Sequence, residues 1–164
     1  FVGKLLNVKM YGVDTSLVAI EYANNHFKNS KNFYKYYDGN TLPFPSNNFD
    51  FVCSFHVIGH VNNVENFLKE AKRVLKNKKK IILVTPNAYY KIFALLDSLV
   101  NFYKPDKTVL KYWFPEKLKK ILVMNGFENI NFVYDGQLPI LFKFFSFLSI
   151  FKSRLVIIAT KKDN

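Results

Sequence analysis

The sequence has one cysteine among 164 residues, Cys53, so no disulfide can form within the chain. A lone cysteine is compatible with a reducing compartment, and we expect a cytoplasmic protein. The first residues lack the long apolar core and the small-residue cleavage site of a secretory signal. The chain begins with Phe1 rather than Met, so we expect a protein that is incomplete at its amino terminus.

Glycine is scarce as well, and its placement excludes two nucleotide-binding motifs. The six glycines are too far apart for a phosphate-binding P-loop or a GxGxxG turn. They are Gly3, Gly12, Gly39, Gly59, Gly126 and Gly136. A kinase-like or NTPase function therefore has no support.

The apolar segment Leu138–Phe151 falls short of a membrane span. It lies in an expected hydrophobic insertion at 137–152 and contains Lys143, whereas a spanning helix needs about 20 apolar residues. The plain interpretation is a hydrophobic helix packed on the sheet. A lid, a surface that grips an apolar substrate and a peripheral membrane contact remain as alternatives.

Basic residues outnumber acidic ones, with 24 Lys and Arg against 12 Asp and Glu. The lysines are mostly scattered, which is typical of a solvated surface and is weak support for a polyanionic partner. An RNA-binding sheet face would need alternating basic and aromatic residues, and the sequence has no such stripe. We therefore expect no specific nucleic-acid partner. The length and the 49% hydrophobic content predict one domain over 1–164.

The stretch from Asp38 to Asn87 predicts a βαβ unit. A buried strand over Phe49–Ser54 is followed by a helix over Val64–Leu75, capped by Asn62 or Asn63. Asn77 and the lysines after it are expected to form a turn before a second strand, Ile81–Val84, which Pro86 stops. The two strands must be parallel, so their carboxyl ends open on one side, where ligands of open α/β sheets bind.

These residues also carry a family resemblance. Four features in this order resemble a class I S-adenosylmethionine-dependent methyltransferase. They are Asp38 with LPF soon after it, FDFV followed by a short loop that contains HV, a helix ending RVLK, and a strand ending PN. The match is to the small-molecule branch of that family. The resemblance implies a Rossmann-like α/β sheet, mostly parallel with a terminal antiparallel hairpin, and S-adenosylmethionine as cofactor.

An earlier strand, Val8–Val13, ends in Asp14, and Thr15 and Ser16 can cap the following helix, Leu17–Phe27. A carboxylate at the end of a parallel strand can accept hydrogen bonds from two ribose hydroxyls. Position alone leaves ribose binding and helix capping open for Asp14, and the resemblance favours ribose binding. Thr15 is included among the expected cofactor-binding residues.

After a strand over Asn32–Tyr37, the turn at Asp38, Gly39 and Asn40 exposes backbone groups. The resemblance implies that Asp38 accepts a hydrogen bond from the adenine amine and that the next backbone N–H meets a ring nitrogen. An ordinary Asx turn is the alternative. The resemblance also places the backbone of Ser54 and Phe55 beside the methionine part of the cofactor.

His56 and His60 follow the central strand, and the resemblance places both near the methyl acceptor. We expect His60 to be the general base where the acceptor must lose a proton, with His56 second, because imidazole exchanges protons near neutral pH. A zinc site formed with Cys53 is the less favoured alternative, and we expect no metal. A second alternative is that a histidine here only closes the end of the site by hydrogen bonding.

The carboxyl-terminal part also matches the family. Ala88–Lys111 corresponds to a substrate-facing lid, and Pro115–Asn125 reads as a helix closed by Gly126. Asn129–Tyr134 and Arg154–Thr160 are expected to form the terminal antiparallel hairpin. The family's first strand, which lies in the centre of its sheet, and its glycine-rich loop have no counterpart, so we expect this fragment alone to be inactive.

The sequence thus predicts methyl transfer to an O, N or C nucleophile of a small or lipid-like acceptor. A non-catalytic, decayed scaffold or a basic module for membrane or RNA surfaces is the first alternative. A nucleotide-cofactor oxidoreductase is the next, and the terminal hairpin and the segment from Asp38 to Phe44 argue against it.

Overall fold

The computed structural model describes residues 8–92, 111–136, 150 and 152–163. The chain divides into two compact units, residues 1–45 and 46–164, and each is described by itself. That the whole chain forms one domain stays a prediction. Most of the expected lid segment Ala88–Lys111 and nearly all of the insertion at 137–152 lie outside the described residues.

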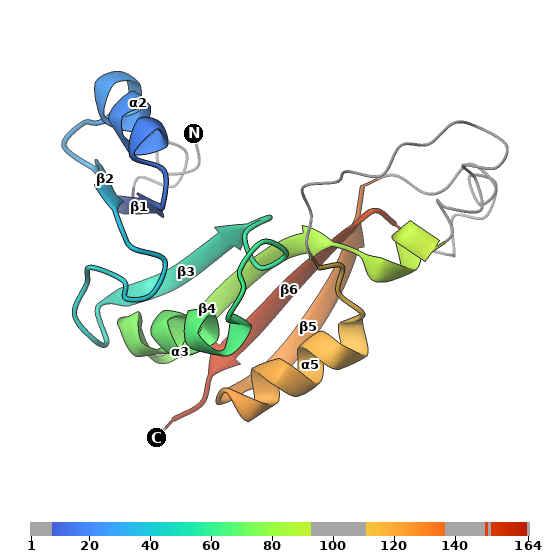
Figure 1. The fold of residues 1–164 in the computed structure, drawn as a ribbon. Coiled ribbons are helices and arrows are strands. Elements are labelled where there is room, and N and C mark those ends of the chain that lie inside the picture. Colours follow the sequence, from blue (N-terminus) through green and yellow to red (C-terminus); the bar gives the residue numbers. More distant parts are fainter. Residues whose placement is uncertain (1–7, 93–110, 137–149, 151, 164) are drawn as a thin grey trace, which may run out of the picture. The chain divides into compact units, whose positions relative to one another are not determined.

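The first unit consists of β1 (Met10–Asp14), α2 (Leu17–Phe27) and β2 (Asn32–Tyr36). The two strands are parallel, with Met10 opposite Asn32 and Asp14 opposite Tyr36 (Figure 1). The side chain of Ser16 accepts a hydrogen bond from the backbone N–H of Ala19 and so caps α2. The helix therefore begins where the capping residues predict.

The second unit is a four-stranded sheet in the order β3-β4-β6-β5. Its elements are β3 (Phe49–Phe55), α3 (Val64–Val74), β4 (Leu75–Pro86), α5 (Pro115–Met124), β5 (Phe127–Asp135) and β6 (Arg154–Lys161). β3 and β4 are parallel, whereas β6 runs antiparallel to both β4 and β5. The predicted Rossmann-like sheet with a terminal antiparallel hairpin is confirmed.

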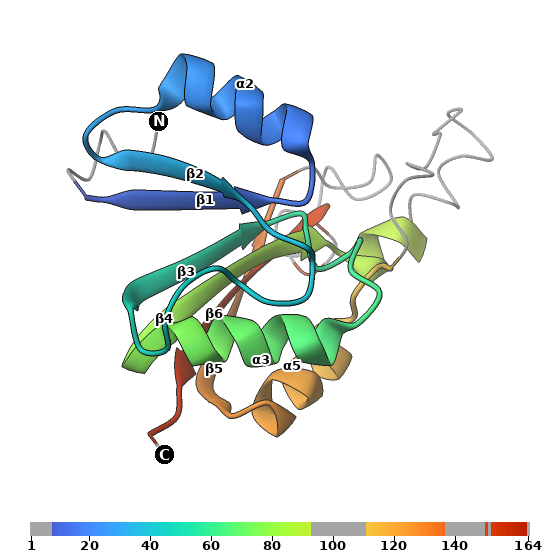
Figure 2. The ribbon, with the colours of Figure 1, turned by 60° about the vertical axis from the view of Figure 1, so that its left-hand side comes forward.

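The core of this unit lies between the sheet and the two helices α3 and α5, which cover the same face of it (Figure 2). Leu68 of α3 and Leu118 of α5 are fully buried there, against Leu83 of β4 and Ile157 of β6. Leu83 and Ile157 are directly paired across the strands, so they share a face. The apolar spacing of both helices thus determines which face of the sheet is covered.

Leu68→Ala is expected to lower the free energy of unfolding by about 2–5 kcal/mol, because it leaves a cavity in a fully buried position. Chemical denaturation followed by circular dichroism measures the change. Val123→Ala is the matched control, since Val123 is exposed and its truncation leaves no cavity. Equal effects of the two substitutions would contradict the core assignment.

β4 begins earlier than predicted, directly after α3, but the expected turn at Asn77 and the lysines is present as an irregularity inside it. Leu75 pairs with Phe49 and Lys80 with Phe51, and Lys78 has a φ of +58°. Lys76 and Lys79 form ion pairs with Asp50 on the neighbouring strand, at 3.1 and 3.3 Å. The four residues 76–79 thus bulge out opposite Asp50, whose carboxylate neutralises two of the lysines.

No helix among the residues described in the structure is long and apolar enough to cross a membrane. The segment Leu138–Phe151 falls almost entirely outside those residues. Its role as a packed helix, a lid or a membrane contact stays a prediction.

Candidate functional site

Two acidic residues lie at one edge of the β1–β2 pair. Asp14 is the last residue of β1 and pairs with Tyr36, the last residue of β2. The backbone N–H of Tyr37 donates to the carbonyl of Asp14 at 3.1 Å, and Asp38 follows directly. Because the strands are parallel, the carboxyl ends that carry both acids meet at the same edge.

The Asp14 side chain is exposed, and its Oδ1 accepts a hydrogen bond from the backbone N–H of Ser16 at 2.8 Å. This bond helps to start α2, as the capping interpretation expects. It engages one oxygen of a group that offers about four acceptor positions. The geometry is compatible with capping and ribose binding at once.

Asp38 forms an Asx turn. Its Oδ1 accepts hydrogen bonds from the backbone N–H groups of Asn40 and Thr41, at 2.8 and 2.9 Å. The bond from Thr41, followed by that from Asn40, lowers the pKa of the Asp38 carboxyl below its ordinary value. Asp38 is therefore an anion at neutral pH, and its carboxylate is held in a fixed direction.

Thr15 and Gly39 lie next to each other, which brings the loop after β1 to the loop after β2. A methyl group added at Gly39 would meet Thr15 Cγ2 at 3.5 Å. Gly39 has a φ of +83°, a conformation that favours glycine. The structure thus brings together five of the expected cofactor-binding residues, which are Asp14, Thr15, Asp38, Gly39 and Asn40.

Tyr37 is a neighbour of this group that the sequence reasoning missed. Burial raises the pKa of the Tyr37 hydroxyl, and the negative charges of Asp14 and Asp38 raise it further. The hydroxyl therefore lies within electrostatic reach of both carboxylates. Nothing in the local sequence distinguishes it from the other tyrosines of this strand.

The remaining expected residues lie in the second unit, where β3 ends. Ser54 is buried, and its Oγ has no hydrogen-bond partner among the residues that the structure describes. Phe55 is 59% exposed. His56 is exposed, has a φ of +59° and donates its backbone N–H to the carbonyl of Val84 at 2.8 Å. A non-glycine residue held in this conformation marks a sharp change of chain direction at the carboxyl end of β3.

The loop that carries His60 is held by hydrogen bonds from residues 111–113, which are distant in sequence. The indole Nε1 of Trp113 donates to the carbonyl of Ile58 at 3.3 Å, and both residues are buried. The backbone N–H of Lys111 donates to the carbonyl of Gly59 at 2.9 Å. The exposed side chain of His60 therefore projects from a loop whose buried part is fixed.

Trp113→Phe is expected to lower the free energy of unfolding by about 1–3 kcal/mol, because the buried carbonyl of Ile58 loses its donor. Urea denaturation measures the change, and Phe114→Leu serves as a control at a more exposed aromatic position. If the loop depends on this bond, the amide of His60 also exchanges hydrogen faster in the variant. An unchanged exchange rate would show that the bond does not hold the loop.

Asn87 also holds two distant segments together through its side chain, a role that the sequence reasoning did not identify. It is fully buried after the end of β4, and its Nδ2 donates to the carbonyls of Ile150 and Lys152 at 2.7 and 2.8 Å. Its Oδ1 accepts from the backbone N–H of Tyr89 at 3.1 Å. The segment leaving β4 is thereby tied to the segment that enters β6.

No group of three or more metal-binding side chains is positioned to hold an ion within the described part of the chain. The alternative of a zinc site made by Cys53, His56 and His60 therefore gains no support. Cys53 is exposed on β3.

Known proteins resemble this chain in sequence and in fold. The model of a family described as "Methyltransferase domain" matches residues 2–83, half of the chain. A demethylmenaquinone methyltransferase from Tropheryma whipplei is 26% identical in an alignment 137 residues long, and the match covers 72% of this chain and 56% of the relative. The chain thus spans little more than half the length of that curated relative.

Solved structures share the fold. A SAM-dependent methyltransferase from Archaeoglobus fulgidus superposes with a TM-score of 0.73 at 20% identity, covering 98% of this chain and 79% of the other. A SAM-dependent methyltransferase from Thermotoga maritima, described as a possible histamine N-methyltransferase, gives 0.67 at 22% identity and covers 98% and 76%. Both solved structures are described as SAM-dependent, and the chain belongs to the methyltransferase domain family.

Proposed function

We propose that the protein transfers the methyl group of S-adenosylmethionine to an O, N or C nucleophile of a small or lipid-like acceptor. The observation that carries this proposal is the pair Asp14 and Asp38 at one edge of β1 and β2. Both lie within the residues that match the family model. The proposed acceptor class rests on exposed apolar side chains near His56, described below.

The residues present fit the cofactor in the first unit. A ribose offers two neighbouring hydroxyl donors, and the exposed carboxylate of Asp14 retains acceptor positions for them. Adenine offers an amine donor, and Asp38 is an oriented anion. In the second unit the buried Ser54 Oγ is a polar atom that still lacks a partner. We assign the ribose to Asp14, the adenine to Asp38 and the methionine part to the backbone of Ser54 and Phe55.

When bound, S-adenosylmethionine supplies an activated methyl group, so the protein's task is chiefly to orient the reactants and exclude water. His60 is the proposed general base, and His56 is the second candidate. Both side chains are exposed at the mouth of β3, where they can reach a molecule in solution. A base is needed only for acceptors that must lose a proton.

Exposed apolar side chains support a small or lipid-like acceptor. Phe55 and Val57 flank His56 and are 59% and 40% exposed. Apolar side chains beside a few polar groups are typical of small-molecule sites. Two relatives, one named for demethylmenaquinone and the other for histamine, indicate which acceptors to test first.

A transfer assay with radiolabelled S-adenosylmethionine tests the proposal on the protein at its full natural length. The acceptors are demethylmenaquinone, histamine and a panel of small phenols and amines. We expect label in one acceptor class, with equal release of S-adenosylhomocysteine. If the protein binds S-adenosylhomocysteine but labels none of these acceptors, the proposed acceptor class is wrong.

A further inference from the structure

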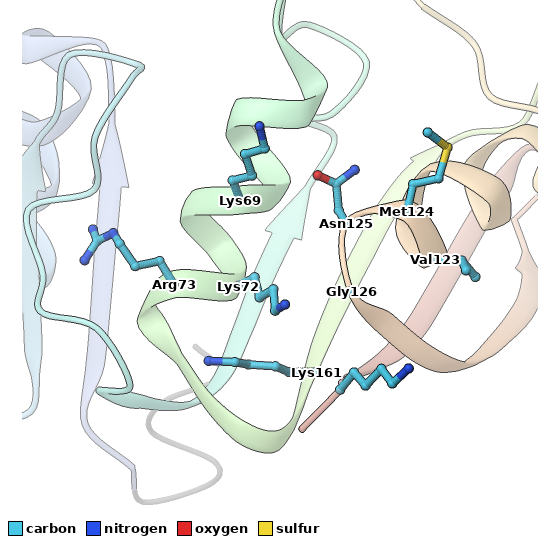
Figure 3. Close-up of a pocket in the computed structure, with 9 residues that line it drawn as sticks. Lys69, Lys72, Arg73, Val123, Met124, Asn125, Gly126 and Lys161 are labelled. Atoms are coloured by element: carbon cyan, nitrogen blue, oxygen red, sulfur yellow. The ribbon is translucent and has the colours of Figure 1, made fainter. Parts of the chain in front are cut away.

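A concave site lies in the unit of residues 46–164, between the end of α3 and the turn that joins α5 to β5. Its volume is about 550 Å³, and it is broadly open to solvent. Figure 3 shows its lining, which consists of Lys69, Lys72, Arg73, Val123, Met124, Asn125, Gly126, Lys161 and Lys162. α3 starts beside the mouth of β3 and ends where β4 begins, so this cavity lies at the opposite edge of the sheet from His60.

The positive charge around this cavity is mostly uncompensated. Arg73 is neutralised by Glu70, with nitrogen to oxygen distances of 2.7 and 2.8 Å. Asp163, which follows Lys162, is engaged by Lys78 at 2.7 Å. The four lining lysines have no ion-pair partner in the described part of the chain; they are Lys69, Lys72, Lys161 and Lys162.

The most buried of these ammonium groups is that of Lys161, which is only 4% exposed. Its Nζ donates to Asn47 Oδ1 at 2.8 Å and to the carbonyl of Leu75 at 2.7 Å, both neutral acceptors. Burial lowers the pKa of Lys161, and the charge of Lys72 lowers it further. Two cations are thus held close enough to repel each other, with no acid between them in the described residues.

Helix capping does not account for the cluster. The last carbonyls of α3 accept the backbone N–H groups of Asn47 and Asn48, at 2.8 Å each. Those of α5 accept the N–H groups of Asn125 and Gly126. The macrodipoles of the two helices favour cations at these ends, but apart from Lys161 the lysines are not needed to satisfy the last carbonyls.

Gly126 makes room for one of the ammonium groups. The residue has a φ of +80°, and a Cβ at this position would collide with Lys72 Nζ. The Lys72 ammonium therefore lies directly against the turn at Gly126, at the wall of the cavity.

We propose that this cavity binds a phosphate group, carried by a small phosphorylated molecule or by a phospholipid headgroup. Phosphate offers several strong acceptor oxygens, and its negative charge would compensate the positive charge of the lysines. Exposed Val123 and Met124 form an apolar wall for the organic part of the ligand. The site is separate from the proposed methyl-transfer site, and the inference does not depend on that function.

Titration calorimetry with inorganic pyrophosphate tests the proposal on the full-length protein. We expect saturable binding that weakens with added salt. In the double variant Lys72→Ala/Lys162→Ala the affinity falls at least about tenfold, because charge-assisted hydrogen bonds are lost. Lys80→Ala is the matched control, since Lys80 is an exposed lysine of β4 that does not line the cavity, and its affinity stays near wild type.

Vesicles of phosphatidylcholine with and without phosphatidylglycerol distinguish the source of the phosphate. Binding of pyrophosphate supports a small phosphorylated ligand, whereas binding only to the anionic vesicles, lost in the double variant, supports a lipid headgroup. Lys162→Ala alone, at an exposed position, provides a second variant if the double variant melts early. Absence of both kinds of binding, or binding that survives the lysine substitutions, would overturn the proposal.

Discussion

Asp14→Ala is expected to weaken binding of S-adenosylmethionine and S-adenosylhomocysteine roughly tenfold to hundredfold. The proposed carboxylate accepts hydrogen bonds from the ribose, and a net loss of about 1.5–3 kcal/mol, the usual contribution of one bond to a charged group, gives this range because 1.4 kcal/mol corresponds to tenfold in affinity. Calorimetric titration of both ligands measures the loss. Asp14→Glu, which keeps the charge, should retain more affinity than Asp14→Ala.

Asp14 also contributes to the start of α2, and a control must separate the two roles. Ser16→Ala removes the side-chain cap of the same helix without touching the Asp14 carboxylate. Loss of that cap costs about 0.5–2 kcal/mol of stability and should leave cofactor affinity close to wild type. If Ser16→Ala weakens binding as much as Asp14→Ala, the effect comes from the helix and the ribose assignment fails.

His60→Ala is expected to lower kcat by about 10²- to 10⁴-fold for an acceptor that must lose a proton, which is the usual contribution of a general base. Affinity for S-adenosylhomocysteine should stay unchanged, because His60 is assigned to the acceptor. Steady-state kinetics and calorimetry on the same preparation separate the two effects.

His56→Ala is the matched comparison for His60→Ala, since both imidazoles are exposed at the same mouth. A larger loss of kcat in His56→Ala would exchange the two assignments. Partial recovery of His60→Ala by added imidazole would support a proton-transfer role over a purely structural one. Full activity of both variants would remove histidine from the proposed mechanism.

Local signals predicted the helices well because the residues that start and stop them act within one turn. Ser16 caps α2, and Pro115 opens α5 before Gly126 closes it with a positive φ. Each of these effects needs only neighbours along the chain. The bounds of α2 therefore agree with the sequence prediction, and those of α5 differ by one residue at its end.

Features that depend on distant partners could not be predicted in the same way. The start of β4 depends on its pairing with β3 and on Asp50, which lies far from it in sequence. The burial of Lys161 depends on acceptors supplied by Asn47 and Leu75. Tyr37 became part of the candidate site only once the two strand ends were placed side by side.

The expected cofactor-binding residues illustrate the same division. Asp14 and Asp38 were recognisable as acids that follow strands, and the structure brings both to one edge in the first unit. Ser54, Phe55 and the histidines lie in the second unit, where β3 ends. Their roles toward the cofactor and the acceptor stay predictions that binding and kinetic measurements must test.

The central claim is tested most directly by calorimetric titration of S-adenosylmethionine and S-adenosylhomocysteine into the protein at its full natural length, with NAD as control. We predict saturable binding of the first two ligands at one site, no binding of NAD, and a clear loss of affinity in Asp14→Ala. A well-folded protein that binds neither S-adenosylmethionine nor S-adenosylhomocysteine would contradict the enzyme assignment and favour a methyltransferase-like scaffold without catalytic activity.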